Sequence, residues 1–337
     1  MMRTVFVLAA LLSAQAAMAQ PAKTLDIYFI DVEGGQSTLI VTPAGESFLV
    51  DAGWGGAGGR DAKRIMNVVR DAGVSQIDYL MVTHFHNDHD GGVPELSRLI
   101  PIRTFVDYGE AIEKGKKVQE PYDEYAKVRR KGTHVEAKVG DKLPLKGIEV
   151  QVVSGRGKTL TEPLSGGGQD NPACSAFAKR ANDFTENSKS LGFRLVYGSF
   201  TFLDLGDLVW NELGQLACPR NKLGHADVYL IAHHGNAFAG VPALTAGVRP
   251  RVVIMNNGET KGGDAKTFTT LHGLEGLEDL WQLHRSANKG TSAQADEKFI
   301  ANLSEDTAHR LKLSAAQDGS FAITNARTGF TKRYDAK

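Results

Sequence analysis

The sequence is poor in the features that define several common classes of protein. Only two of its 337 residues are cysteines, Cys174 and Cys218, too few for a domain built on a disulfide framework. Whether these two form a disulfide is left open, because sequence does not show their distance in space. Lysine plus arginine and aspartate plus glutamate are both 39. The chain therefore lacks the basic excess of most nucleic-acid-binding proteins, and its net charge does not favour a nucleic-acid partner.

Long apolar runs are also missing after the N-terminal segment. A membrane-spanning helix needs roughly 18 or more consecutive apolar residues, and no later segment has them. With 42% hydrophobic and 23% charged residues, the chain can still bury a sizeable core. We therefore expect a folded protein without a membrane span, whose oligomeric state the sequence does not reveal.

The first nineteen residues differ from the rest. Arg3 precedes an apolar segment over residues 4–13, and Ala17-Met18-Ala19 forms a small-x-small sequence before Gln20. This order is typical of a secretory signal peptide, which is removed on export. We expect residues 1–19 to be a signal peptide, residues 20–337 to form one domain, and the mature protein to be periplasmic or secreted.

A cluster of histidines and aspartates directly follows a predicted buried strand. Three histidines and two aspartates lie within residues 84–90. In an extended segment, residues two apart point the same way, so His84 and His86 can reach one point in space. Asp88 and His89 follow where two glycines allow the chain to turn, so a second, adjacent position is available.

The residue types in this cluster point to a metal ion. Imidazole and carboxylate ligands suit zinc, and also manganese or iron. No cysteine lies nearby, which favours an open, catalytic site over a closed structural one. The alternative is a polar loop whose histidines bond to one another and to the backbone. We expect Zn²⁺, as one or two ions.

The same residues resemble a known family. His84-Phe85-His86-Asn87-Asp88-His89 is similar to the HxHxDH signature of the metallo-β-lactamase-fold hydrolases. Two other segments resemble the ComEC-like branch, the hydrolase domain of a competence protein: Asp31-Val32 followed by Gly34-Gly35-Gln36-Ser37, and His233-His234-Gly235. The resemblance implies an α/β (α+β) fold of four layers, in which two packed mixed sheets are flanked by helices.

The resemblance also assigns site residues. Asp207, which follows a predicted pair of strands, corresponds to the carboxylate that bridges two metal ions in the family. Asp88 is the candidate catalytic residue, because it could orient the attacking water besides acting as a ligand. The implied metal ligands are His84, His86, Asp88, His89, Asp207 and His234.

Four further residues are expected beside the ligands. Asp51 corresponds to an aspartate that supports the ligand loop, a role that metal sites generally require. His233 is expected next to the ligand His234, although the two could be reversed. Many family members carry another histidine before the strands that lead to the bridging aspartate. This chain has Asn187 and Ser190 there, so the first metal position is expected to be weaker or substituted.

The implied function is hydrolysis by a metal-activated water. Phosphoesters, particularly phosphodiesters, rank first as substrates, because the ComEC-like branch points that way and paired cations suit in-line displacement at phosphorus. The alternatives are a lactone, a carboxylic ester or a β-lactam. A third hypothesis is a degenerate metal-binding protein without catalysis.

Two further expectations concern regions outside the motifs. Residues 107–190 are less regular and are interpreted as a family-variable insertion that shapes access to the site. Residues 268–283 have apolar side chains at helical spacing, which predicts helices with His272 and His284 on their polar faces. Trp54, in a glycine-rich loop, is expected at the rim of the site.

Overall fold

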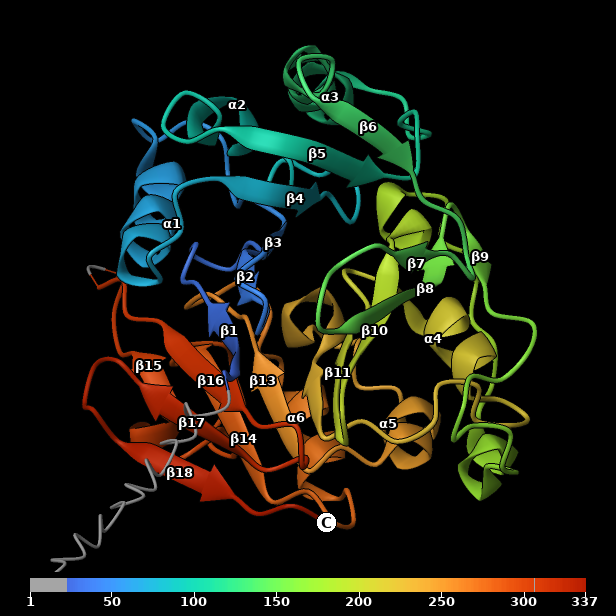
Figure 1. Cartoon of the computed structure of the whole chain (residues 1–337). Helices are drawn as coiled ribbons and strands as arrows, with labels where there is room; N and C mark the ends of the chain where they lie inside the picture. The colour runs from blue at the N-terminus through green and yellow to red at the C-terminus, as the bar shows by residue number, and fades with distance from the viewer. Residues whose placement is uncertain (1–22, 306) are drawn as a thin grey trace, which may run out of the picture.

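The structure is a computed structural model that describes residues 23–305 and 307–337. The predicted signal peptide, residues 1–19, lies outside the described residues. Two nine-stranded mixed sheets pack face to face, with helices on their outer faces (Figure 1). The predicted four-layer α/β fold is therefore confirmed. Within the described ranges, every helix is too short or too polar to cross a bilayer.

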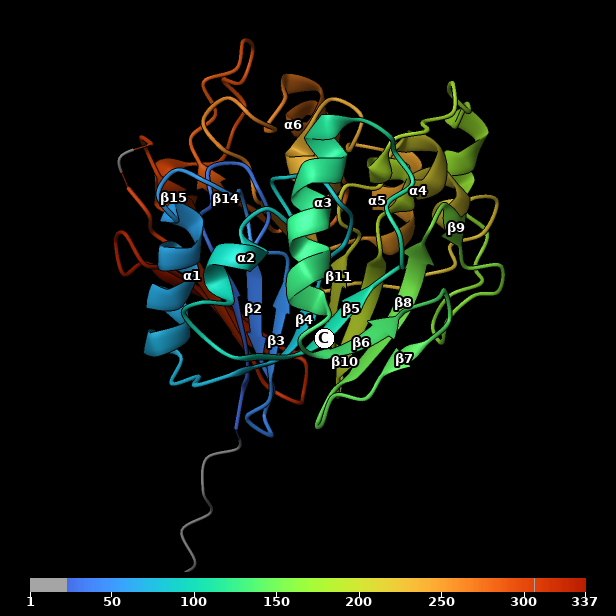
Figure 2. The same cartoon turned by 90° about the horizontal axis from the view of Figure 1, so that it is seen from above.

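The first sheet has the strand order β18-β17-β16-β1-β2-β3-β4-β5-β6. Strands β1 to β3 form an antiparallel meander, whereas β3 to β6 are parallel neighbours. Helices α1 (Arg60–Asp71), α2 (Val93–Leu96) and α3 (Lys116–Arg129) cover its outer face (Figure 2). The strands are β1 (Leu25–Phe29), β2 (Thr38–Val41), β3 (Ser47–Val50), β4 (Ile77–Met81), β5 (Ile102–Asp107), β6 (Thr133–Glu136), β16 (Leu311–Ala315), β17 (Phe321–Asn325) and β18 (Thr331–Tyr334).

The second sheet has the order β15-β14-β13-β12-β11-β10-β8-β7, and β9 pairs with β8. Strands β11 to β15 are parallel neighbours. Helices α4 (Trp210–Ala217), α5 (Pro242–Val248) and α6 (Ala265–His272) lie on its outer side (Figure 1). The strands are β7 (Lys142–Leu143), β8 (Glu149–Gly155), β9 (Lys158–Thr159), β10 (Gly192–Tyr197), β11 (Phe200–Asp204), β12 (Val228–Leu230), β13 (Val252–Met255), β14 (Asp279–His284) and β15 (Ile300–Asn302). Short 3-10 helices are η1 (Pro172–Ala176), η2 (Glu186–Lys189), η3 (Ala232–Gly235) and η4 (Glu297–Phe299).

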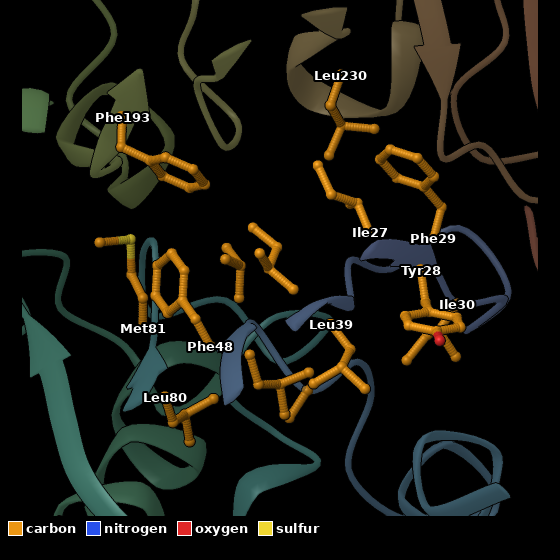
Figure 3. Close-up of a cluster of buried hydrophobic side chains, with 14 of the residues drawn as sticks. Ile27, Tyr28, Phe29, Ile30, Leu39, Phe48, Leu80, Met81, Phe193 and Leu230 are labelled. Carbon is orange, nitrogen blue, oxygen red and sulfur yellow. The ribbon is translucent and has the colours of Figure 1, made fainter. Parts of the chain in front are cut away.

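The main core lies between the two sheets. Successive strand residues face opposite sides, so Phe202 packs into this core while Leu203 packs under the outer helices. Phe48 of the first sheet meets Phe193 of the second, with ring centroids 5.5 Å apart (Figure 3). This apolar contact fixes the spacing of the sheets and therefore the relative positions of the loops at their ends.

The helix predicted over residues 268–283 is only half correct. Helix α6 ends at His272, and residues 279–284 form strand β14. This strand lies between β13 and β15 and is covered on both faces. Its sequence therefore lacks the alternation of apolar and polar residues that distinguishes a strand from a helix. His284 is fully buried rather than on a polar helix face, whereas His272 is exposed.

Residues 107–190 also differ from the expectation. The region is not a separate insertion, because it supplies β6 to the first sheet and β7, β8 and β9 to the second. Its last part is tied down by a disulfide between Cys174 and Cys218, which joins η1 to the end of α4. The structure thus answers the question that the sequence left open.

We predict that Phe48→Ala lowers the free energy of unfolding by about 3–5 kcal/mol, because it leaves a cavity beneath Phe193 in the main core. Chemical denaturation of the mature protein measures the change. Leu99→Ala is the control, since Leu99 is 50% exposed and its loss should cost no more than about 0.5 kcal/mol. Equal stabilities of the two variants would contradict the prediction.

Candidate metal centre

The candidate site lies where parallel strands of both sheets end. Strands β3 and β4 of the first sheet, and β11 and β12 of the second, lead into loops that carry predicted site residues. Backbone hydrogen bonds join these loops to neighbouring segments. Leu191 N donates to Thr83 O at 2.8 Å, and Gln36 N donates to Asp88 O at 3.1 Å. The loops are thereby held together before any side chain is considered.

Four predicted ligands converge on one point. Asp88, His89, Asp207 and His234 each offer one ligand atom, and these atoms lie within 4.8 Å of one another. His234 Nε2 lies 3.2 Å from Asp207 Oδ2 and 3.3 Å from Asp88 Oδ2. His89 Nε2 lies 3.4 Å and 3.3 Å from the same two oxygens. All four side chains are buried. We call them the four-residue group.

The four-residue group fits a divalent cation. His89 Nε2, His234 Nε2 and Asp207 Oδ1 are buried and have no hydrogen-bond partner in the part of the chain that the structure describes. Each such unsatisfied group costs about 1–3 kcal/mol. A cation coordinated by two carboxylates and two imidazoles would remove this penalty, and zinc, manganese and iron all accept such ligands.

His84 and His86 form a second, less complete set. His84 Nε2 lies 3.0 Å from His86 Nδ1 and 4.0 Å from Asp207 Oδ2. Ser190, in the region where relatives place a histidine, instead accepts a hydrogen bond from the Asp207 backbone N at 3.2 Å through its Oγ. Asn187 Oδ1 is buried and unpartnered among the described residues. The structure therefore brings all the predicted ligands to one site, but in two sets of unequal completeness.

Asp51 holds the ligand loop. Its Oδ2 lies 2.7 Å from His89 Nδ1, so that His89 Nε2 faces the four-residue group. The same carboxylate accepts hydrogen bonds from Thr83 N at 2.8 Å and Thr83 Oγ1 at 2.7 Å. A carboxylate behind a histidine fixes its ring orientation and tautomer in many metal sites.

The two histidines after β12 lie in a strained turn. His233 and His234 have φ angles of 49° and 54°, and Gly235 continues the left-handed conformation with φ of 73°. For residues with side chains, this conformation costs about 1–3 kcal/mol each. The turn directs both rings to Asp207, whose Oδ2 is 3.6 Å from His233 Nε2. His234 is buried in the group, whereas the His233 side chain is 20% exposed beside it.

Glu113 is a site residue that the sequence did not reveal. Its Oε2 lies 3.3 Å from His86 Nε2, on the far side of the ring from His84. The buried Glu186 positions it, because Glu113 N donates to Glu186 Oε1 at 2.7 Å and Glu186 N donates back to Glu113 Oε2 at 3.1 Å. Region 107–190 therefore reaches the site itself.

Lys261 was also missed. Its ammonium contacts Asp88 Oδ2 and lies 4.6 Å from the centroid of the Trp54 ring. Lys261 belongs to a glycine-rich loop that follows β13, and β13 is parallel to the strands that lead to Asp207 and His234. That position after a parallel strand is the signal by which sequence reasoning could have found it. Trp54 lies at the rim, as expected.

The electrostatics of the site keep the carboxylates ionised. Burial would raise the pKa of Asp88, but His89 and Lys261 outweigh it and hold that pKa well below its usual range. Burial would likewise raise the pKa of Asp207, yet the histidines around it lower it well below its usual range. The pKa of His84 is lowered well below its usual value, mainly by burial, so its imidazole is neutral. These protonation states suit metal ligands. His89 differs: burial would lower its pKa, but Asp207 and Asp88 raise that pKa well above its usual value, so a metal ion would have to displace a proton from this ring.

A second cluster of candidate ligands is better explained as an ion-pair network. His284 Nε2 lies 2.6 Å from Asp31 Oδ1 and 3.5 Å from Glu33 Oε2. Arg64 Nη1 lies 2.9 Å from Asp31 Oδ2 and 2.7 Å from Glu33 Oε1. Because a guanidinium already balances the two carboxylates, this cluster does not fit a cation as the four-residue group does.

Comparison with known proteins agrees with this geometry. Residues 30–169 match the family model of the metallo-beta-lactamase superfamily. Over these residues the chain is similar to the metallo-beta-lactamase superfamily. Its two mixed sheets flanked by helices have the metallo-beta-lactamase fold, and that fold together with the four-residue group implies that it binds a divalent metal ion.

Individual relatives are distant. An atrochrysone carboxyl ACP thioesterase from Aspergillus terreus is 37% identical over 67 residues, so the chain spans only 20% of that relative and the match covers 20% of this chain. The fold protein YhfI from Bacillus subtilis is 11% identical over 77% of this chain and 96% of its own, with a TM-score of 0.47. MEM-A1, a subclass B3 metallo-beta-lactamase from a soil metagenome library, is 16% identical. The match covers 80% of this chain and 85% of MEM-A1, with a TM-score of 0.36. These likenesses transfer no substrate.

We predict that Asp51→Asn weakens zinc binding by about 10–100-fold, because the amide cannot accept from both His89 and Thr83 as the carboxylate does. Competition with a chromophoric chelator measures the affinity. Asp318→Asn, on an exposed turn, is the matched control and should bind zinc as the unchanged protein does. If Asp51→Asn folds and its zinc affinity is unchanged, Asp51 does not support the metal site.

The two ligand sets should differ in affinity. We predict that His234→Ala removes the tightly held ion, whereas His86→Ala leaves about one ion per chain after dialysis, because the four-residue group remains complete. Metal analysis of the dialysed proteins gives the stoichiometry. Loss of all metal in His86→Ala would show that the two sets act as one.

Proposed function

We propose that the protein is an exported metal-dependent hydrolase that acts on a phosphoester, with a phosphodiester ranked first and zinc as its metal. The observation that carries the proposal is the four-residue group, with four buried ligand atoms within 4.8 Å and orphaned imidazole nitrogens among them. The superfamily match and the thioesterase relative support a metal-dependent hydrolase in general.

The charge of the site favours an anionic substrate. Its candidate ligands comprise two carboxylates, Asp88 and Asp207, and imidazoles that bind a metal ion in their neutral form, so two divalent ions would leave the centre positively charged. A phosphodiester carries its negative charge on the reacting group itself. When bound, such ions polarise the substrate and lower the pKa of a water molecule, and paired cations suit in-line displacement at phosphorus.

The chain's own residues would orient the reactants. Asp88 is the candidate to orient the attacking water, because its ionised carboxylate belongs to the four-residue group. Asp207 would hold both positions, since its Oδ2 lies 3.2 Å from His234 Nε2 and 4.0 Å from His84 Nε2. Asp51 would keep His89 in the ligand orientation from behind.

The finer parts of the proposal rest on sequence. The ComEC-like assignment depends on the motifs around Asp31 and His233-His234-Gly235, and export depends on residues 1–19. The competence-protein likeness is the reason for placing phosphodiesters above other esters.

Acyl compounds are the second candidate. The similarity to a thioesterase over 67 residues favours attack at an acyl carbon, which a thioester, lactone, carboxylic ester or β-lactam would offer. A metal-binding protein without catalysis is the remaining alternative, and the incomplete set at His84 and His86 motivates it.

We predict that the mature protein loaded with zinc or manganese hydrolyses bis(p-nitrophenyl) phosphate, and that Asp207→Asn lowers kcat/KM by at least about 100-fold, because it disturbs both ligand sets. Release of p-nitrophenol measures turnover. Glu162→Gln, at an exposed position, is the control for surface charge and should retain full activity.

No turnover by protein shown to hold metal would reject the phosphodiester. The same preparation is then tested against thioester, lactone and β-lactam panels. Hydrolysis in one of these panels that is lost in Asp207→Asn would move the acyl reading to first place, and inactivity in all of them would favour the non-catalytic alternative.

A further inference from the structure

Lys261 joins the metal centre to the surface. Its ammonium contacts Asp88 Oδ2, yet its side chain is 36% exposed, so it reaches the buried group from the open side. The Trp54 ring lies 4.6 Å from the same ammonium and supports it through a cation–π contact. No other lysine of the described chain contacts the four-residue group in this way.

The backbone around Lys261 is held in place by the metal-site loop. Gly258 N donates to Lys261 O at 2.9 Å, and Gly263 N donates to His234 O at 2.9 Å. Gly262 has φ of 70°, and a Cβ there would meet His234 O at 2.1 Å, so only glycine fits between the two loops. Lys261 is thereby positioned relative to a ligand, while its flexible side chain stays free to move.

A bound cation and the Lys261 ammonium would compete for the same oxygen of Asp88. The oxygen that Lys261 contacts, Asp88 Oδ2, is also the oxygen that lies 3.3 Å from both His89 Nε2 and His234 Nε2. A divalent ion in the group would take this oxygen and repel the ammonium. Lys261 would then need another anionic partner within reach of the metal centre.

We propose that this partner is an anionic oxygen of the substrate, and that Lys261 is a specificity-determining residue that exchanges Asp88 for a phosphoryl or carboxylate oxygen when metal binds. The inference rests on the proposed function only in that the substrate binds at the four-residue group. An ammonium bound to an oxyanion forms a charge-assisted hydrogen bond, one of the stronger kinds.

Binding of inorganic phosphate to the zinc-loaded mature protein tests the proposal by calorimetry, without any need for turnover. Lys261→Met should bind phosphate at least about ten-fold more weakly than the unchanged protein, and Lys261→Arg should restore most of the affinity. Lys266→Met, on the exposed side of α6, is the matched control and should bind phosphate normally. Equal phosphate affinity in Lys261→Met and Lys266→Met would overturn the proposal.

Zinc affinity provides the second readout. Lys261→Met should bind zinc at least as tightly as the unchanged protein, and up to several-fold tighter, because no ammonium competes for Asp88. Zinc binding about ten-fold weaker in this variant would mean that Lys261 supports the metal site, and would overturn the exchange of partners.

A parallel titration with acetate separates the two sources of the anion. Tighter binding of phosphate than acetate, dependent on Lys261, supports a phosphoryl group, and the reverse supports a carboxylate. Failure of the proposed phosphodiesterase activity leaves this result standing if Lys261→Met still loses anion binding. If Lys261→Met still binds anions normally and the protein hydrolyses phosphodiesters, the proposal for Lys261 is rejected and the proposed function stands.

Discussion

The arrangement of the site depends on two buried carboxylates, whose charge the surrounding groups must compensate. Asp88 and Asp207 are both buried and face His89 and His234 at 3.2–3.4 Å. An ionised carboxylate is costly in such surroundings unless positive charge compensates it. Lys261 and His89, whose pKa these carboxylates raise, supply that compensation, and a bound cation would supply more. Loops from both sheets meet at this point, next to the apolar core between the sheets.

The backbone around these carboxylates is strained at three residues. Asp51, His233 and His234 all adopt left-handed conformations that side chains disfavour. They are held there by contacts on every side: Asp51 accepts three hydrogen bonds, His233 N donates to Gly206 O at 3.0 Å, and Gly263 N donates to His234 O. The strain determines where the side chains point, because a relaxed turn would direct the imidazoles away from Asp207.

The fold and the site were predictable to different extents. The strand before the histidine cluster and the cluster itself were accessible because an extended segment ending in a turn sets side-chain directions locally. The supporting aspartate, Asp51, was expected only from the family resemblance. Strand β14 was wrongly predicted as helix, because a strand buried on both faces shows no alternation of apolar and polar residues. Region 107–190 was interpreted as an insertion because irregular segments separate its strands. Strands β7, β8 and β9 pair with one another locally, and only the tertiary structure shows that β6 joins the first sheet and β8 joins the second through β10.

By itself, the sequence determined the local part of the site, from His84 to His89, together with its preference for a metal ion, because spacing within a few residues depends only on backbone geometry. The family resemblance already named Asp207 and His234 as distant members of the site, but only the tertiary structure shows how they meet it and adds Glu113 and Lys261. Asp207 and His234 meet Asp88 because β11 and β12 end opposite β4, and Glu113 and Lys261 arrive on loops whose paths depend on the pairing order of whole sheets. Pairing order arises from long-range packing of the two sheets, which no local pattern of residues encodes.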